Sequence, residues 1–358
     1  MNYHVITTFK CNLNCQYCGA GSRDYSSHKI KWSMDDLKKF ISQDTDPLIA
    51  FYGGEPLLRA DLVKKVMDNV PATYAIQTNG ILLDKLEESY IKKFHSILIS
   101  LDGEKEVTDT NRGDGVFDKV MTQVKRLREM DYQGDVIARM TISANGDVLR
   151  DVMVLLEMEP HFDHVHWQLD FCLFWEGGTH PEKWIESSYN PGITKLVDKW
   201  LQEMEKGKVL GIVPFLGVMG SFLRDEKEGL RCGCGNYFFA IEPSGKIASC
   251  PVTPEEDGLV LGDIYHSKPK EIRNSARLQD PCASCDILDD CGGRCLIMNH
   301  NQENMADYGY PMMCWTVRHF ISEMRRVQPR VQELIDKDVV TLEDFNYPKL
   351  NVGCEIIP

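Results

Sequence analysis

Three cysteines lie close together near the start of the chain, in the segment CNLNCQYC. They are Cys11, Cys15 and Cys18, with the spacing C-x3-C-x2-C and no further Cys or His among them. A structural zinc site normally completes its tetrahedron with a fourth ligand. A cubane [4Fe–4S] cluster held by three thiolates keeps one iron open for a substrate or cofactor, and backbone N–H groups of a small polar loop can bind its sulfides. The spacing favours such a cluster, with zinc and a distant fourth ligand as the alternative.

A second group of cysteines begins at Cys232. Of the 13 cysteines in the chain, nine lie between this residue and the C-terminus. Eight of these are closely spaced: Cys232, Cys234, Cys250, Cys282, Cys285, Cys291, Cys295 and Cys314. A zinc ribbon would explain Cys282 and Cys285 but not the others, whereas eight thiols suffice for two fully ligated cubane clusters. Of the two left over, Cys172 is interpreted as a structural thiol, with a hydrogen donor near a radical as the alternative, and Cys354 as incidental.

Apolar and β-branched runs of strand length recur through the first half of the chain. They occupy residues 3–8, 48–54, 73–80, 96–103, 135–142 and 164–171, and segments of helical periodicity lie between them. Strands alternating with helices predict an α/β fold with a parallel sheet, and six such units fit a partial (β/α)6 TIM-like barrel. One helix is expected to begin with Ser33 as its N-cap, because Asp36 follows three residues later.

Polar or glycine-rich residues gather where each of the first four strands ends. The cysteine loop follows the first strand, GGEP (53–56) the second, TNG (78–80) the third and LDG (101–103) the fourth. Active sites of barrel-like α/β folds lie at the carboxyl ends of the strands. These motifs therefore predict one functional rim.

Composition excludes several other classes of protein. No run of 18 apolar residues predicts a membrane span, and the start of the chain does not have the pattern of a signal peptide. We therefore expect a cytoplasmic location, where 13 cysteines indicate metal or redox chemistry in place of disulfides. A net charge of −14 disfavours binding to nucleic acid.

The cysteine loop and GGEP together resemble the radical S-adenosylmethionine (radical SAM) enzymes, over roughly residues 1–175. In that family the methionyl amine and carboxylate chelate the open iron of the first cluster. One electron then cleaves the sulfonium to give a 5′-deoxyadenosyl radical, which removes hydrogen from an unactivated carbon. The cofactors carry this chemistry, and the protein supplies orientation and excludes water.

The resemblance implies roles for individual residues on the rim. Cys11, Cys15 and Cys18 would ligate the cluster, and Tyr17 would contact adenine. Residues expected to contact S-adenosylmethionine are Tyr17, Gly53, Gly54, Glu55, Pro56, Asn79, Ser100, Asp102 and Arg139. For Ser100 and Asp102 the alternative is a capped strand-to-loop turn. For Arg139 the alternative to holding the methionyl carboxylate is an outward surface arginine on a half-buried strand.

The later cysteines, with Gly245 between the second and third of them, resemble the SPASM domain that follows the radical SAM barrel in peptide-modifying enzymes. The resemblance assigns Cys234, Cys250 and Cys295 to a first auxiliary [4Fe–4S] cluster, and Cys232 is its natural fourth ligand. An open iron in that cluster is the alternative, because a single residue separates Cys232 from Cys234. The second auxiliary cluster would use Cys282, Cys285, Cys291 and Cys314.

Four regions are expected along the chain: the barrel (1–190), a bridge (191–230), the cysteine-rich SPASM domain (231–320) and a helical tail (321–358). The resemblance implies S-adenosylmethionine, three [4Fe–4S] clusters, a peptide or protein substrate and a reducing partner such as ferredoxin or flavodoxin, in an anaerobic setting. We expect no leader-binding domain before the barrel, and we therefore expect the barrel, the bridge or a separate partner to hold the substrate.

The type of reaction stays open among crosslinking, epimerisation and oxidation. Sulfatase-maturing relatives carry an Asp directly after the second SPASM cysteine, whereas Pro251 stands here, which disfavours formylglycine formation. The alternatives are a radical SAM enzyme acting on a small-molecule metabolite and a non-catalytic iron–sulfur electron-transfer protein.

Overall fold

The six expected strands are present and pair in parallel in the order of the sequence. A computed structural model describes residues 1–18, 29–170, 181–227, 229–252, 259–300 and 309–348. The strands are β1 (Asn2–Thr8), β2 (Leu48–Gly53), β3 (Thr73–Thr78), β4 (Phe94–Ser100), β5 (Asp135–Ile142) and β6 (His164–Leu169). Their carboxyl ends therefore share one edge of the sheet, as the motifs predicted.

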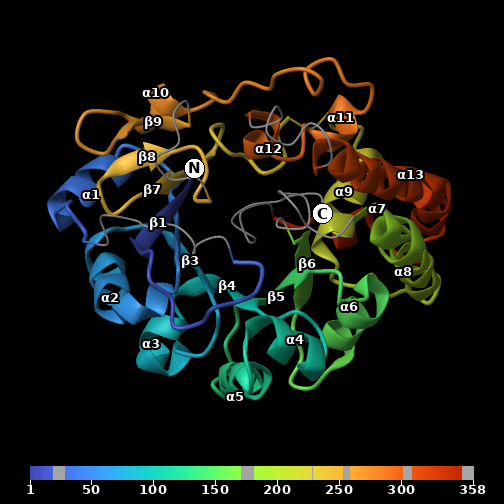
Figure 1. The fold of residues 1–358 in the computed structure, drawn as a ribbon, viewed down its shortest axis with the longest axis horizontal. Helices are drawn as coiled ribbons and strands as arrows, with labels where there is room; N and C mark the ends of the chain where they lie inside the picture. Colours follow the sequence, from blue (N-terminus) through green and yellow to red (C-terminus); the bar gives the residue numbers. More distant parts are fainter. Residues whose placement is uncertain (19–28, 171–180, 228, 253–258, 301–308, 349–358) are drawn as a thin grey trace.

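The helices between these strands lie outside the sheet, along the periphery in Figure 1. They are α1 (Met34–Ile41), α2 (Ala60–Asn69), α3 (Glu88–Ile91), α4 (Lys105–Arg112), α5 (Val116–Glu129) and α6 (Val148–Glu157), with short turns η2 (Pro56–Arg59) and η3 (Leu83–Lys85). The predicted N-cap of α1 is confirmed, because Ser33 and Asp36 form a capping box. The main core packs between the helices and the outer face of the sheet, with residues such as Phe51 and Ile76 fully buried.

The inner face of the sheet is lined differently from the outer face. Successive side chains of a strand point to opposite faces, and the inward positions of β2 and β3 carry Ala50 and Ala75, which form a small cluster of their own with Leu48. These small residues leave space at the inner face of the sheet for longer inward-pointing side chains of the other strands.

The cysteine-rich region continues the same sheet beyond β1. Strand β7 (Phe238–Ile241) pairs in parallel with β1, and β8 (Lys246–Ala248) and β9 (Val260–Asp263) follow as antiparallel neighbours. The sheet thus has nine strands in the order β6-β5-β4-β3-β2-β1-β7-β8-β9. The region expected at 231–320 is therefore joined to the barrel by the backbone hydrogen bonds between β7 and β1.

The bridge and the tail are helical. The remaining elements are α7 (Pro181–Trp184), η5 (Ile185–Tyr189), α8 (Asn190–Met204), α9 (Val213–Leu223), α10 (Pro269–Ile272), α11 (Leu288–Cys291), α12 (Leu296–His300), α13 (Gly309–Asp336) and η7 (Leu342–Phe345). Buried Phe215 of α9 contacts Trp167 of β6 and Phe320 of α13. Helix α13 runs through the boundary expected at 320/321 without a break. No helix among the described residues has the length and apolarity to cross a membrane.

Candidate functional site

The first cysteine loop follows directly from β1. The Leu13 N–H donates to Cys11 Sγ at 3.4 Å, and the Cys18 N–H donates to the Cys15 carbonyl at 3.0 Å. Burial raises the pKa of Cys15 to about 11; nearby Arg112 opposes this rise, and the Cys18 and Cys11 thiols add to it. The three thiols therefore lie near one another. Neighbouring thiolates repel, and a cationic iron centre would relieve that repulsion, so the donor set fits a cluster with three protein ligands.

The GGEP loop is hydrogen-bonded to the backbone that leads into the cysteine loop. The Gly54 N–H donates to the Thr8 carbonyl at 2.9 Å, and the Glu55 N–H donates to the Lys10 carbonyl at 2.8 Å. A Cβ at Gly53 would lie 2.1 Å from the Thr8 oxygen, and one at Gly54 would lie 2.3 Å from the Lys10 oxygen. Both glycines are thus required by the close approach of two backbones.

Glu55 is fully buried and binds the loops on either side of it. One carboxylate oxygen, Oε1, accepts hydrogen bonds from the Leu57 N–H and the Thr78 hydroxyl, each at 2.8 Å. The other, Oε2, accepts from the Asn79 N–H at 2.8 Å. Burial raises the pKa of Glu55, and these three donors oppose the rise. The carboxyl group therefore joins the GGEP loop to the end of β3.

Asn79 connects this arrangement to the cysteine loop. Its Nδ2 donates to Asn12 Oδ1 at 2.8 Å and lies 3.8 Å from Cys11 Sγ. Pro56, also buried, begins the turn η2. Four expected site residues (Gly53, Gly54, Glu55 and Asn79) are thus brought against the cysteine loop.

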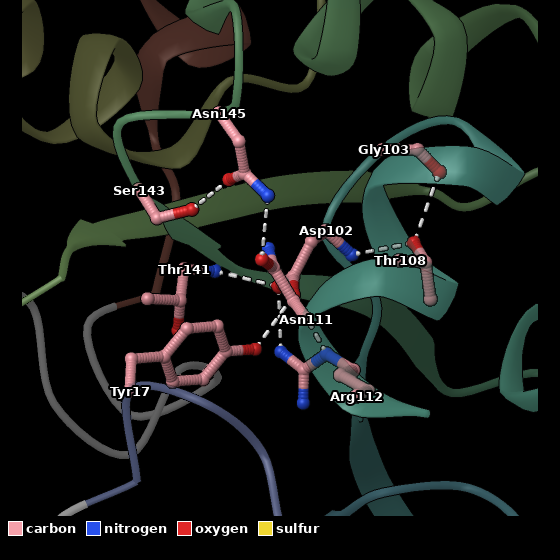
Figure 2. Close-up of polar contacts among 9 residues, drawn as sticks. All are labelled: Tyr17, Asp102, Gly103, Thr108, Asn111, Arg112, Thr141, Ser143 and Asn145. Atoms are coloured by element: carbon pink, nitrogen blue, oxygen red, sulfur yellow. Dashed lines mark hydrogen bonds and ion pairs between the residues drawn. The ribbon is translucent and has the colours of Figure 1, made fainter. Parts of the chain in front are cut away.

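Asp102 lies at the centre of a buried network that the sequence did not reveal (Figure 2). The Arg112 guanidinium donates to it from Nε at 3.0 Å and from Nη2 at 2.6 Å. The Tyr17 hydroxyl donates at 2.6 Å, the Thr141 N–H at 2.9 Å and Asn111 Nδ2 at 3.2 Å. Asp102 has no exposed surface. It joins the cysteine loop, α4 and β5.

This network changes the interpretation of Tyr17 and Asp102. Burial raises the pKa of Tyr17, while Arg112 opposes the rise and the Asp102 carboxylate adds to it, so the hydroxyl stays protonated as a donor. Both carboxylate oxygens of Asp102 already accept from the protein. The contact between Asp102 and S-adenosylmethionine stays a prediction. Arg112 was missed because it lies ten residues away on a separate helix, where spacing carries no signal.

Arg139 lies on the inner face of the sheet. It is 8% exposed, and it pairs in register with Ser100 on one side and His166 on the other. Burial lowers the pKa of His4 to about 3, with the Arg139 charge as a further cause, which places the guanidinium near β1. The alternative of an outward surface arginine is therefore wrong.

The thiols expected at the first auxiliary cluster come together in a small apolar cluster. Cys232, Cys234 and Cys250 are buried, packed with Leu230 and Phe238. Burial raises the pKa of Cys295 to about 11; Arg294 opposes the rise, and the Cys232 and Cys250 thiols add to it. Cys232 and Cys250 therefore both lie near Cys295.

The four thiols expected at the second auxiliary cluster line one cavity of ≈570 Å³. Burial raises the pKa of Cys314 to about 11, and the Cys282, Cys291 and Cys285 thiols contribute to the rise. This donor set fits a cluster with four protein ligands. In the described part of the chain, no three His, Cys, Asp or Glu side chains are placed to hold a single metal ion. Cys172 and Cys354 lie outside the described residues.

Comparison with known proteins identifies the family of the first half of the chain. A family model described as the radical SAM superfamily matches residues 5–166. These residues form a radical SAM domain, and the chain is an enzyme.

Several relatives match most of the chain. The cysteine-type anaerobic sulfatase-maturating enzyme of Clostridium perfringens is 23% identical over 345 residues, covering 87% of this chain and 92% of the relative. The mycofactocin maturase MftC of Mycolicibacterium smegmatis is 25% identical over 315 residues, covering 81% and 76%. The AdoMet-dependent heme synthase of Methanosarcina barkeri is 23% identical over 326 residues, covering 80% and 88%.

The fold is also found in a solved structure, that of anSMEcpe with bound AdoMet. The TM-score is 0.74 at 20% identity, with 97% of this chain and 99% of that chain covered. The same protein has been solved with AdoMet and the Kp18Cys peptide, with a TM-score of 0.73 at 20% identity and 94% and 99% covered. The similarity shows that the radical SAM barrel and the cysteine-rich region adopt a known arrangement.

Proposed function

We propose that this enzyme binds S-adenosylmethionine and three [4Fe–4S] clusters and modifies a peptide or protein after translation. When bound, the cluster at Cys11, Cys15 and Cys18 and S-adenosylmethionine together supply a radical able to remove hydrogen from an unactivated carbon. The observation that carries the proposal is the convergence of these three thiols at the carboxyl end of β1, with the GGEP backbone hydrogen-bonded to the same loop.

The chain's own residues would bind and orient S-adenosylmethionine. Gly53 and Gly54 bring the backbone of their loop close to the cysteines, and Glu55 holds that loop to β3. Arg139, buried on the inner face, would donate hydrogen bonds to the methionyl carboxylate, with Ser100 beside it in register. Tyr17 is held through its hydroxyl and by the Arg112 guanidinium over its ring, and its aromatic ring would contact adenine.

The remaining thiols would hold two auxiliary clusters. Cys232 is proposed as the fourth ligand of the first, together with Cys234, Cys250 and Cys295, because it lies near Cys295. The second has Cys282, Cys285, Cys291 and Cys314. Four thiolates for each leave no open iron, which suits electron transfer with a reducing partner such as ferredoxin or flavodoxin.

A peptide substrate is favoured by the maturases among the relatives. Formylglycine formation is not proposed, because Pro251 has no side chain that could act as a base at the position after Cys250. The second candidate is a small-molecule substrate, which the heme synthase relative favours. Incubation with candidate peptides under anaerobic conditions, with mass spectrometry of the peptide, separates the two.

The first experiment is iron analysis with product detection. Anaerobically reconstituted protein should bind about twelve irons and release 5′-deoxyadenosine from S-adenosylmethionine. The Cys11→Ala/Cys15→Ala/Cys18→Ala variant should lose about four irons and all cleavage. The Cys282→Ala/Cys285→Ala variant is the control, since it should lose iron yet keep some cleavage. A wild-type content of about four irons would show that the auxiliary clusters do not exist.

A further inference from the structure

Arg294 is a buried arginine whose charge no carboxylate neutralises in the described part of the chain. It is only 9% exposed. Its Nη1 contacts Met298 Sδ at 3.5 Å, and its Nε has no hydrogen-bond partner. A guanidinium is never deprotonated in a protein, and burying it without a counter-ion is strongly unfavourable. The position therefore implies an anion beside it.

The location of Arg294 indicates which anions these are. It directly precedes Cys295, assigned to the first auxiliary cluster, and it lines the ≈570 Å³ cavity with the four thiols assigned to the second. Burial raises the pKa of Cys295, Cys291 and Cys314, and the nearby Arg294 charge partly offsets that rise at each. One cation thus lies within electrostatic reach of ligands from both sets.

The backbone at Arg294 supports a role for the side chain. Its φ of +41° lies in the left-handed region. The two preceding residues, Gly292 and Gly293, also have positive φ, of +67° and +78°. Glycine adopts this region freely, whereas a residue with a Cβ is strained there. Arginine at a position suited to glycine indicates that the side chain offsets the strain.

We propose that Arg294 is a counter-ion shared by the two auxiliary clusters, raising the reduction potential of each and holding their ligand loops together. This inference rests on the two auxiliary clusters of the proposed function. A thiolate-ligated [4Fe–4S] cluster is anionic, and one-electron reduction adds another negative charge. A fixed cation in a buried site stabilises the reduced state more than the oxidised state.

The test is a mediated redox titration of the reconstituted holoenzyme, followed by electron paramagnetic resonance. In Arg294→Gly the glycine suits the backbone and the charge is lost. Both auxiliary clusters should become harder to reduce, by about tenfold in the reduced-to-oxidised ratio, which is about 59 mV for one electron. Arg294→Lys keeps the positive charge, so its auxiliary clusters should have reduction potentials close to those of the wild-type protein. The spectral component that changes when S-adenosylmethionine is added belongs to the cluster at Cys11, Cys15 and Cys18. The reduction potential of that cluster should not shift.

The matched control is Arg325→Gln on α13. Arg325 joins α13 to Asp290 in the cysteine-rich region, and its polar contacts are with Asp290 and Gln328 through oxygen. Because this pair is exposed to solvent and screened, the variant should shift the potentials much less than Arg294→Gly does. Unchanged potentials in Arg294→Gly, or equal shifts in both variants, would overturn the proposal.

Iron content decides the case in which the glycine variant loads poorly. Loss of iron in Arg294→Gly that Arg294→Lys restores supports a required positive charge. Equal loss in both variants would overturn the proposal, because shape and not charge would then matter. Failure of the wild-type protein to bind more than about four irons would instead disprove the auxiliary clusters themselves.

Discussion

Asp102 and Arg112 form a buried ion pair that is hydrogen-bonded to the Cys11–Cys18 loop through Tyr17. The Arg112 side chain is 6% exposed and the Asp102 side chain 0%. The carboxylate accepts hydrogen bonds from three segments far apart in the sequence, including Tyr17 between the second and third cysteines of the loop (Figure 2). The position of the cysteine loop thus depends on the buried Asp102–Arg112 pair.

We expect Asp102→Asn to destabilise the barrel by about 3–5 kcal/mol, because the substitution leaves Arg112 buried without its anion. Denaturant unfolding followed by circular dichroism measures this change. Asp61→Asn is the control, since the Arg59–Asp61 pair is exposed, with side chains 38% and 71% accessible. That variant should change stability by less than about 1 kcal/mol. Equal effects of the two variants would contradict the assigned role of the buried pair.

At the scale of elements, β1 is an interior strand only because the cysteine-rich region supplies β7. Four residues of β1, Asn2 to Val5, pair in register with Phe238 to Ile241. Without β7, an apolar strand would present an unpaired edge.

We therefore expect a chain ending at residue 231 to aggregate, even though it retains all six barrel strands. Size-exclusion chromatography and light scattering measure this outcome. The full chain, prepared and handled identically, is the control. A soluble monomer that unfolds cooperatively would show that β1 does not need this pairing.

The six strands could be predicted because each is a local apolar run bounded by its own turn signals. The rim motifs were recognisable because parallel strands place their carboxyl ends at one edge. The β1–β7 pairing joins segments far apart in the chain, and no local pattern specifies which strands become neighbours. The same holds for Arg112, Thr141 and Arg294, whose roles depend on burial and on partners from other elements.

On the scale of the whole molecule, the two halves are expected to divide the reaction between them. Among the cysteines that the structure describes, only those of the Cys11–Cys18 loop lie on the rim with GGEP, so cleavage of S-adenosylmethionine should depend on that loop. A substrate radical that must lose an electron would pass it to an auxiliary cluster.

We expect Cys291→Ala/Cys314→Ala to retain some reductant-driven 5′-deoxyadenosine formation and to lose the modified product. Both products are assayed in the same anaerobic reaction, with circular dichroism to check folding. The Cys11→Ala/Cys15→Ala/Cys18→Ala variant is the control that should lose both. A folded double variant that modifies substrate at the wild-type rate would rule out an essential role for the second auxiliary cluster.

The pairing of β1 with β7 also sets a delay during synthesis. Residue 238 emerges long after residue 5, because more than 230 residues separate them in the chain. At about 5–20 residues per second, the interval is roughly 10 to 50 s. Throughout this interval, strand β1 can pair with β2 but not yet with β7. The nascent barrel must therefore remain incomplete until its last sheet neighbours arrive, and slower translation would lengthen its exposure to mispairing.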